Sequence, residues 1–521
     1  MASSYEPVNH LDEGTHTQIQ QIIDAHEGTL DVPHVVTLDD ADEYAGTFTN
    51  TGTGTKALHV VGNMLVDGSI ENEGGPVYNV VSYGADESGA TFSDSAIAAA
   101  IADIPSYGGK LYFPAGVYKV NGAITFDKPG TIVGDGLIAS IIDSYSATAD
   151  VITLIPATGY TAKVEGLAIR KQVTATDGAG IRLTSSGDGI NMPTIEHCAI
   201  QHQYYGVRAD KAVGITINGC YIAENLNSGL YLQNTTNVDS GDHAISNCIF
   251  ANVAAISGSD VAIRQLSSGG LKISNNKFIG FTDQYHLSLA AGASTGVLVI
   301  DGNSFEGQGT STHSNIRFDN SSGGSLWVYS IISNNEFGCL GPEASLIIGT
   351  AGGWLDTMIV SGNTFQVAGT KCISLAGGSH IYIHGNNIFG QGGSSVAFEV
   401  GAGVSHLHIG RNHIRGITTL LSGATPEIME PCVQYGTTTS VTNTVYGALY
   451  STPDITVTFP VAYRTAPKVT ASCEGNGGAY NGAVGVAIKS VSVSQFVCSL
   501  VGITNGVTLT LHWSAYGDES I

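Results

Sequence analysis

Charged side chains are scarce in this chain of 521 residues: Asp, Glu, Lys and Arg make up 12% of it, where about 25% is usual. Basic residues are the scarcest, with 20 Lys and Arg against 44 Asp and Glu, and the formal net charge is −24. A chain this acidic repels the phosphate backbone of DNA and RNA. We therefore expect no nucleic-acid partner.

Long apolar runs are missing as well. No stretch of about eighteen apolar residues occurs in the sequence, so we expect no membrane insertion. Residues 1–10 contain neither a basic region nor an apolar segment. This predicts that the chain carries no secretion signal and folds in the cytoplasm.

Cysteine is infrequent, with 8 residues in the chain, and no pair of cysteines has metal-ligand spacing such as Cys-x-x-Cys. The sequence also has no phosphate-binding or dinucleotide-binding glycine loop between a strand and a helix. We expect reduced structural thiols, no metal and no cofactor.

Glycine, in contrast, is abundant, with 68 residues in the chain. That is roughly 13%, where about 7% is usual. Frequent turns together with β-branched residues throughout indicate an ordered, all-β protein.

A six-residue pattern recurs nine times in the middle of the chain: apolar, any, Gly or Asn (His197 and Arg411 in the first and last copies), Asn or Cys, any, apolar. The copies are 195–200, 217–222, 245–250, 273–278, 300–305, 332–337, 360–365, 383–388 and 409–414.

The fourth position of this repeat recurs every 27 residues or so, about one coil of a parallel β-helix. Equivalent corners of successive coils stack about 4.8 Å apart, so we expect asparagines there to hydrogen-bond from coil to coil as a ladder. Cysteine replaces asparagine where a small apolar group suits burial. The ladder residues are Cys198, Cys220, Cys248, Asn276, Asn303, Asn335, Asn363, Asn386 and Asn412.

A second repeat lies half a coil away and consists of one residue between two apolar residues. Because side chains alternate between the two faces of a strand, this middle residue faces outward. We predict that the resulting column binds sugars through guanidinium and ring-stacking contacts. Its candidate residues are Arg182, Arg208, Tyr231, Arg264 and Arg317. The alternative is that these arginines only keep a weakly charged strand face soluble.

Residues 93–104 are expected to form a helix, with Ile97, Ile101 and Ile104 on its apolar face, Ser93 or Asp94 as its cap and Pro105 at its end. A helix at this point can cover the unpaired strand edges at the end of a β-helix.

The sequence around this helix resembles the amino-terminal signature of the pectate-lyase superfamily. The matching motifs are YGA at 83–85, GG at 108–109 and YFPAG at 112–116, whereas the acidic loop at 86–89 is shorter than usual. The resemblance implies a right-handed parallel β-helix of the kind found in phage tailspikes and polysaccharide-degrading enzymes.

Repeat and resemblance together divide the chain into four parts. Residues 1–76 would be an amino-terminal virion-attachment or adaptor module, or else a pre-cap without a partner. Residues 77–120 would form the cap and 121–425 the right-handed parallel β-helix. Alternating strands predict a carboxy-terminal β-sandwich over 426–521, for trimerisation or glycan binding.

The resemblance further implies a homotrimeric phage tailspike, located in the virion and joined to the phage tail or baseplate. It would bind and depolymerise a bacterial surface polysaccharide by glycoside hydrolysis or lyase chemistry. Two alternatives stay open: a non-catalytic receptor-binding tail fibre, and a free polysaccharide-degrading enzyme.

Cleavage of a polysaccharide requires two carboxylates, or a base beside a uronate together with a cation. The best candidates form a central group near the arginine column. Alternation places two of them on the outer face that carries Arg208 and Arg317, and others lie in the loop before Ile245. The group comprises Asp210, Glu224, Asp239, Asp242, His243 and Asp319.

Two further sets of residues are candidates. Glu165 and Glu196 precede equivalent corners of neighbouring coils and would stand about 5 Å apart. Repulsion between the two carboxylates could raise the pKa of one of them. Alternatively, Arg170 and Lys171 could neutralise both. The second set lies in adjacent coils, where we expect surface histidines rather than a metal site. It comprises His380, His384, His406 and His408.

Overall fold

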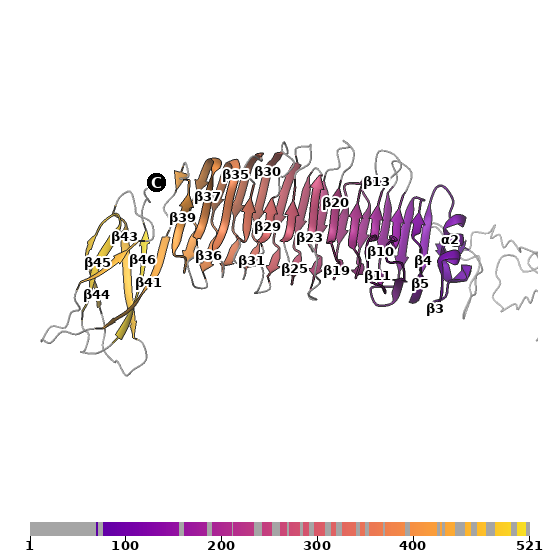
Figure 1. Ribbon diagram of the computed structural model, residues 1–521, viewed down its shortest axis with the longest axis horizontal. Helices are drawn as coiled ribbons and strands as arrows, with labels where there is room; N and C mark the ends of the chain where they lie inside the picture. Colours follow the sequence, from indigo (N-terminus) through magenta and orange to yellow (C-terminus); the bar gives the residue numbers. More distant parts are fainter. Residues whose placement is uncertain are drawn as a thin grey trace, which may run out of the picture. The chain divides into compact units, whose positions relative to one another are not determined.

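The computed structural model describes residues 69–70 and 77–516. Gaps in this description fall at 156–160, 185–189, 211, 234–241, 253–260, 268–269, 282–284, 291–295, 308–313, 319–325, 340–343, 350–353, 368–369, 391–395, 425–427, 430–432, 443–453, 460–465, 476–484 and 502–507. Most described residues belong to a parallel β-helix whose strands stack in sequence order, from β4 at one end to β39 at the other (Figure 1). The predicted fold class is confirmed.

Three walls of parallel strands form this β-helix. Wall 1 begins each coil, and its first pairing, between β1 and β2, is antiparallel. Its strands are β1 Ser69–Ile70, β2 Val77–Asn79, β4 Gly109–Phe113, β7 Gly130–Gly134, β10 Ala162–Glu165, β14 Thr194–Glu196, β18 Thr216–Asn218, β21 His243–Ser246, β24 Leu271–Ser274, β27 Gly296–Asp301, β30 Leu326–Ser333, β33 Trp354–Ser361 and β40 Ile428–Met429.

Wall 2 follows wall 1 across a sharp corner and belongs to a different sheet, which continues beyond the β-helix into the carboxy-terminal strands. Its strands are β3 Ser88–Phe92, β5 Gly116–Val120, β8 Ser140–Ser144, β11 Ala168–Lys171, β15 Ala199–Gln201, β19 Tyr221–Ala223, β22 Ile249–Ala251, β25 Lys277–Ile279, β28 Ser304–Glu306, β31 Glu336–Cys339, β34 Thr364–Val367, β36 Asn387–Gly390 and β38 His413–Arg415.

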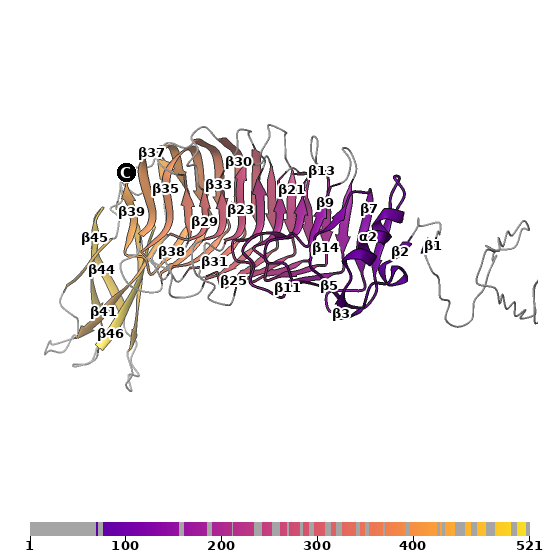
Figure 2. The ribbon, with the colours of Figure 1, turned by 45° about the vertical axis from the view of Figure 1, so that its right-hand side comes forward.

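Wall 3 completes each coil. Its strands are β6 Ile124–Phe126, β9 Ile152–Leu154, β12 Ala179–Leu183, β16 Tyr205–Ala209, β20 Ser228–Gln233, β23 Val261–Ser267, β26 Tyr285–Leu289, β29 Ser314–Phe318, β32 Leu346–Ile348 and β39 Thr419–Gly423. In two late coils a single long strand, β35 Lys371–His384 or β37 Val396–Ile409, runs through wall 3 into wall 1 (Figure 2). A short pair, β13 Ile190–Asn191 and β17 Ala212–Val213, lies between walls 3 and 1.

The corner between walls 1 and 2 explains the third position of the repeat. Gly219, Asn247, Gly302 and Asn334 occupy this corner with φ of 63°, 55°, 67° and 55°. Glycine adopts this left-handed conformation without a Cβ clash, and asparagine tolerates it better than most residues. The Gly-or-Asn pattern is therefore a backbone requirement of the turn.

The next residue of each corner points inward and forms the expected ladder. Nδ2 of Asn303 donates to Oδ1 of Asn335 and to the carbonyl of Ile273, both at 3.0 Å. Its Oδ1 accepts from the backbone N–H of Asn276 at 2.9 Å and from Nδ2 of the same residue at 3.0 Å. The predicted ladder is confirmed from Asn276 to Asn412. Cysteine continues the column at Cys198, Cys220 and Cys248, all buried and free.

The last apolar position of the repeat fills the interior with stacked rings. Phe250, Phe278, Phe305, Phe337 and Phe365 follow one another on wall 2, and their neighbouring ring centroids are 5.2, 4.7, 4.9 and 4.6 Å apart. Each of these side chains is fully buried. Burial of this column contributes to the rigidity of the walls that carry the outward-facing side chains.

The predicted helix is confirmed as α2, Asp94–Asp103, which follows the short 3-10 helix η1, Val80–Tyr83. Its Ile97 and Ile101 join the main core. Ser93 is the N-cap residue, as expected, but its side chain makes no capping hydrogen bond: the Ser93 hydroxyl accepts from the Asp86 backbone N–H, and the Asp94 carboxylate accepts from the Gly122 backbone N–H. No helix in the described part of the chain is both long and apolar enough to cross a membrane.

Antiparallel strands follow the β-helix, consistent with the expected sandwich. One sheet joins β41 Val433–Thr442, β46 Thr508–Tyr516 and β43 Lys468–Gly475, and the other joins β42 Ile455–Thr458, β45 Gln495–Val501 and β44 Gly485–Val491. Phe459, Phe496 and Trp513 pack together in the core between them.

Candidate functional site

The strand register places the predicted column on the outer face of wall 3. Arg182 of β12 aligns with Arg208 of β16, Tyr231 of β20 and Arg264 of β23 in turn. One rung further on is Ser288, and then Arg317 of β29. The common column that the sequence predicted for these five residues is therefore confirmed, whereas its role in sugar binding stays a prediction.

Asp210 holds two of these guanidinium groups in place. Its Oδ2 lies 2.9 Å from Nε and 2.8 Å from a terminal nitrogen of Arg182, and its Oδ1 lies 2.9 Å from Nε of Arg208. Asp150 contacts Arg182 from the other side at 3.3 Å. The Asp210 carboxylate is only 10% exposed, so charge-assisted contacts with the two guanidinium groups replace most of its hydration. Asp210 thus orients cations.

Aromatic rings adjoin these cations. The guanidinium carbon of Arg208 lies 5.2 Å from the ring centroid of Tyr205 and 5.8 Å from that of Tyr231, and the two rings are 4.8 Å apart. Tyr204 meets Tyr205 edge to face at 4.8 Å. Burial raises the pKa of the Tyr205 and Tyr231 hydroxyl groups, which therefore remain hydrogen-bond donors at neutral pH.

The same combination of arginine and tyrosine recurs further along wall 3. Arg317 donates a hydrogen bond to the Tyr285 hydroxyl, and its guanidinium carbon lies 5.1 Å from that ring centroid. Tyr205 and Tyr285 were not predicted, although a tyrosine three residues before an arginine of the column is a readable signal in the first case. We call Arg182, Tyr205, Arg208, Tyr231, Arg264, Tyr285 and Arg317 the arginine–tyrosine surface.

Glu224 lies at the opposite end of wall 3 from Asp210. It follows β19, at the corner that leads into wall 3, and its Oε2 is 3.1 Å from Nδ1 of His202 in the preceding coil. Both residues have left-handed backbone, with φ of 55° and 60°. Because β16 separates the two corners, Glu224 and Asp210 do not meet as one pair of carboxylates.

The sequence predicts His243 in a loop with other catalytic candidates, but the structure places it in a strand. This residue begins β21, is 2% exposed, and accepts the backbone N–H of Ile215 through Nδ1 at 3.1 Å. Burial lowers the pKa of His243 to about 4, so the imidazole is neutral at pH 7. Asp242 precedes it with left-handed backbone, φ 65°. Asp239 and Asp319 lie outside the described residues.

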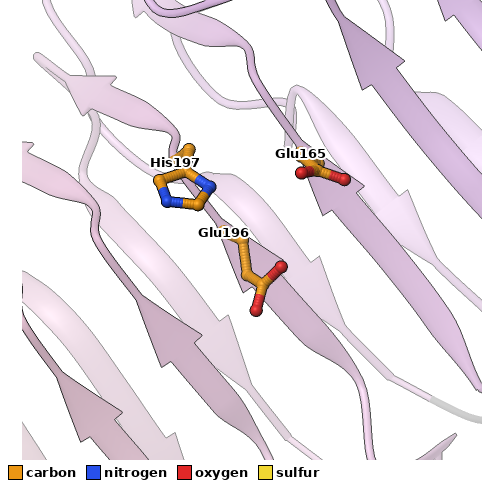
Figure 3. Close-up of side chains that lie close together, drawn as sticks. All are labelled: Glu165, Glu196 and His197. Carbon is orange, nitrogen blue, oxygen red and sulfur yellow. The ribbon is translucent and has the colours of Figure 1, made fainter.

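Glu165 and Glu196 stand on neighbouring strands of wall 1, as predicted (Figure 3). The expected neutralising residues are wrong: Arg170 pairs with Asp143, and Lys171 donates to backbone carbonyls. Lys163 instead bridges both glutamates at 2.8 Å, and these hydrogen bonds raise its pKa.

His197 follows Glu196, and its ring can approach the two carboxylates as a third ligand for a cation (Figure 3). The Lys163 ammonium already occupies the position between the carboxylates. This group therefore fits a metal poorly.

The histidines of the late coils are stacked. His380 and His406 have ring centroids 4.7 Å apart, and Nδ1 of His380 lies 2.7 Å from Oδ1 of Asp356. Tyr382 and His408 align in neighbouring strands, as the 26-residue offset predicted. Parallel rings direct their nitrogens side by side rather than toward one point, which agrees with the expectation of surface histidines.

The fold and the outward polar walls define a parallel β-helix protein with an extended surface of cations and aromatic rings. A family profile described as rhamnogalacturonase A/epimerase, pectate lyase-like, matches residues 77–394. The chain belongs to this family. Membership of this family supports an enzyme that acts on polysaccharides.

Several solved structures are similar to the chain. The Agl-KA catalytic domain matches with a TM-score of 0.49 and 14% identity over 70% of each chain. The AlgE6 A-module, a mannuronan C-5 epimerase of Azotobacter vinelandii, matches with a TM-score of 0.46 and 15% identity over 68% of this chain and 97% of that one. The tailspike gp61 of Pseudomonas phage phi297 matches with a TM-score of 0.41 and 13% identity over 85% of this chain and 99% of that one. A search of curated proteins found no match.

Proposed function

We propose that this protein is a phage tailspike that binds and depolymerises a bacterial surface polysaccharide, namely a capsule, O-antigen or exopolysaccharide. The observation that carries the proposal is the arginine–tyrosine surface, where Arg208 lies over two tyrosine rings and is fixed by Asp210. Membership of a pectate lyase-like family supports a polysaccharide as the substrate class.

The glycan would lie along wall 3, parallel to the stack of rungs. Tyrosine rings offer flat faces for the C–H side of sugar rings, and guanidinium groups pair with carboxylates or hydroxyls through two N–H donors. With rungs about 4.8 Å apart, the column from Arg182 to Arg317 extends over roughly 24 Å, long enough for several sugar units. Asp210 and Asp150 act as positioning residues for Arg182 and Arg208.

We assign proton transfer to Glu224, at the corner that leads into wall 3. It is 29% exposed and contacts His202, which can take up or supply a proton. A hydrolase requires a second carboxylate, and Asp239 and Asp319 are our candidates for it. In a lyase, the arginines would instead stabilise the enolate of a uronate.

The same proposal includes assembly and location. As a tailspike, the chain would form a homotrimer and attach to the phage tail or baseplate through its amino-terminal region. That region is the acidic part of the chain: residues 1–108 contain 17 Asp and Glu and a single basic residue, Lys56. Its charge suits a basic docking partner in the virion.

The test uses purified full-length protein and surface polysaccharides from candidate hosts, with chain length and reducing ends followed over time. Absorbance near 232 nm marks an unsaturated uronate and hence a lyase, whereas reducing ends without it mark hydrolysis. We expect Glu224→Gln to lower the cleavage rate by about 10²-fold or more. A wild-type cleavage rate in the Glu224→Gln variant would show that Glu224 takes no part in the cleavage reaction.

Arg208→Ala tests the binding surface separately. The loss of a charged, stacked contact should weaken glycan binding about tenfold. The matched control is Arg170→Ala on wall 2, where the arginine also pairs with an aspartate, Asp143, at 2.8 Å. Equal weakening by both variants would show that wall 3 is not the specific surface.

A non-catalytic receptor-binding fibre is the second candidate. One observation favours it: Asp210, Glu165 and Glu196 each contact a lysine or arginine at 2.8 to 2.9 Å, so all three carboxylates are already paired with a cation. Binding of the host glycan without any change in its chain length would support this candidate.

A further inference from the structure

Three side chains from successive coils meet where wall 2 leads into wall 3, at the amino-terminal end of the β-helix (Figure 1). Phe92 ends β3, Lys119 lies in β5 and Tyr145 follows β8. The Lys119 ammonium lies 4.6 Å from the ring centroid of Phe92 and 4.4 Å from that of Tyr145. We call these three residues the lysine–aromatic site.

The two rings form a corner beside the ammonium. Their centroids are 6.0 Å apart and their planes are nearly perpendicular, at 88°. Phe92 is 52% exposed and Tyr145 is 38% exposed, so both rings keep surface in contact with solvent. Such a corner can hold a sugar ring by its C–H side while a charged substituent of that sugar meets the cation.

Hydrogen bonds to neighbouring rungs fix the backbone at this site. The Ser93 N–H donates to the Lys119 carbonyl at 2.8 Å, and the Tyr145 N–H donates to the Val120 carbonyl at 2.9 Å. The three side chains therefore start from strands or strand ends of fixed register. Little conformational freedom of the backbone is lost when a ligand binds to such a site.

The positive charge of Lys119 is not neutralised within its own column. The next two positions on wall 2 are Asp143 and Arg170, and the Arg170 guanidinium occupies both oxygens of Asp143, at 2.8 and 3.0 Å. Among the described residues, the Lys119 ammonium forms no ion pair and contacts the two rings instead. A cation without a carboxylate partner, beside two partly exposed rings, suits an anionic ligand that also has an apolar face.

We propose that the lysine–aromatic site binds one acidic sugar unit of the polysaccharide, with its carboxylate at the Lys119 ammonium. For its ligand this rests on the proposed function, to which it adds a second binding site and a carboxylated sugar. Tyr145 and Asp150 are five residues apart, at most about 18 Å, and Asp150 contacts Arg182 at 3.3 Å. One glycan chain of several units can therefore reach from the arginine–tyrosine surface to this site.

A fluorescent reporter separates this site from wall 3. Phe92→Trp keeps a flat ring and adds an indole whose emission changes when a sugar stacks on it. The full-length variant is titrated with disaccharides of galacturonate, glucuronate and mannuronate, which are too short to span both surfaces, and with maltose as the neutral sugar. After subtraction of the wild-type emission, we expect a saturable change with at least one acidic disaccharide, at an affinity at least tenfold above that for maltose.

Lys119→Met, combined with Phe92→Trp, should weaken this binding at least tenfold, because methionine is also unbranched but carries no charge. The matched control is Lys110→Met on β4, where an exposed lysine belongs to wall 1. This control should bind like Phe92→Trp alone. If Lys119→Met does not fold, Tyr145→Ala removes one ring and keeps the ammonium, and it should also weaken binding about tenfold.

The inference is overturned if no acidic disaccharide gives a saturable change, if maltose binds equally well, or if Lys119→Met binds with unchanged affinity. Cleavage of the host polysaccharide, and its binding by Arg208→Ala, test the proposed function separately. A protein that cleaves its glycan but shows no titration would refute the lysine–aromatic site alone. A titration without any cleavage would refute depolymerisation and keep this site.

Discussion

At the scale of single residues, Asp210 illustrates how one carboxylate can fix two arginine side chains. It is almost buried, and its two oxygens are divided between Arg182 and Arg208. Removal of one partner from such a pair leaves uncompensated charge, which is why these contacts are hard to alter singly. The two guanidinium groups are thus held in fixed positions.

His243 provides a residue-scale prediction on pH. Its pKa is about 4 in the folded protein, against 6.5 as the usual value, so the unfolded chain binds more protons between these pH values. The stability that neutral His243 contributes is fully present above about pH 6.5 and is lost as the pH falls toward 4, by about 3 kcal/mol in total. Urea unfolding at a series of pH values measures this loss.

His243→Gln keeps an acceptor near the backbone N–H of Ile215 but removes the titration, so its stability should fall less steeply below pH 6.5. His197→Gln replaces an exposed imidazole and should retain the wild-type dependence. Identical pH profiles for His243→Gln and wild type would refute the assignment.

Side-chain alternation, read more strictly, would have improved two predictions at this scale. His243 and Ile245 are two residues apart, and Ile245 faces inward, so the same face holds His243 as well. In the same way, Lys163 shares an outer face with Glu165 and could have been recognised as its partner. The contact of Asp210 with Arg182 spans 28 residues and required the coil register.

At the scale of elements, the asparagine ladder connects successive coils along one buried corner. Asn386 donates from Nδ2 to the Val360 carbonyl at 2.9 Å and to Asn412 Oδ1 at 2.9 Å, and its Oδ1 accepts from Asn363. Asn386→Ala deletes these contacts and leaves buried polar groups without partners. We expect a loss of about 2 to 4 kcal/mol in the free energy of unfolding.

The neighbouring residue provides the control. Asn387 begins β36 with a partly exposed, outward side chain. Asn387→Ala should change the free energy of unfolding by less than about 0.5 kcal/mol. Chemical denaturation of both variants gives the comparison, and a similar loss in the two would mean that the ladder adds no more than a surface asparagine.

The elements themselves were largely predictable because their causes are local. The Gly-or-Asn position marks a left-handed corner, and the helix at 94–103 follows from its apolar spacing. The break at 492–494 that divides 485–501 into β44 and β45 was less evident, because valine and serine alternate across it.

At the scale of the whole molecule, each coil contacts mainly the coils before and after it. Stability in such an array is roughly a sum over coils and their interfaces, and opening begins at the ends. We therefore expect amide hydrogen exchange to be slowest in the central rungs, from β21 to β27, and faster in β39 and β40. Exchange followed by mass spectrometry tests this, and uniform protection from β4 to β40 would contradict it.

Unequal spacing along the ladder has a consequence for how such a protein can diversify. Consecutive asparagines are 27, 32, 28, 23 and 26 residues apart, yet their hydrogen bonds all measure 2.9 to 3.0 Å. Residues added to or removed from the other two corners leave that seam undisturbed. Loops of other lengths and sequences can accordingly be exchanged one coil at a time, so the outer surface can change stepwise while the stack of coils stays intact.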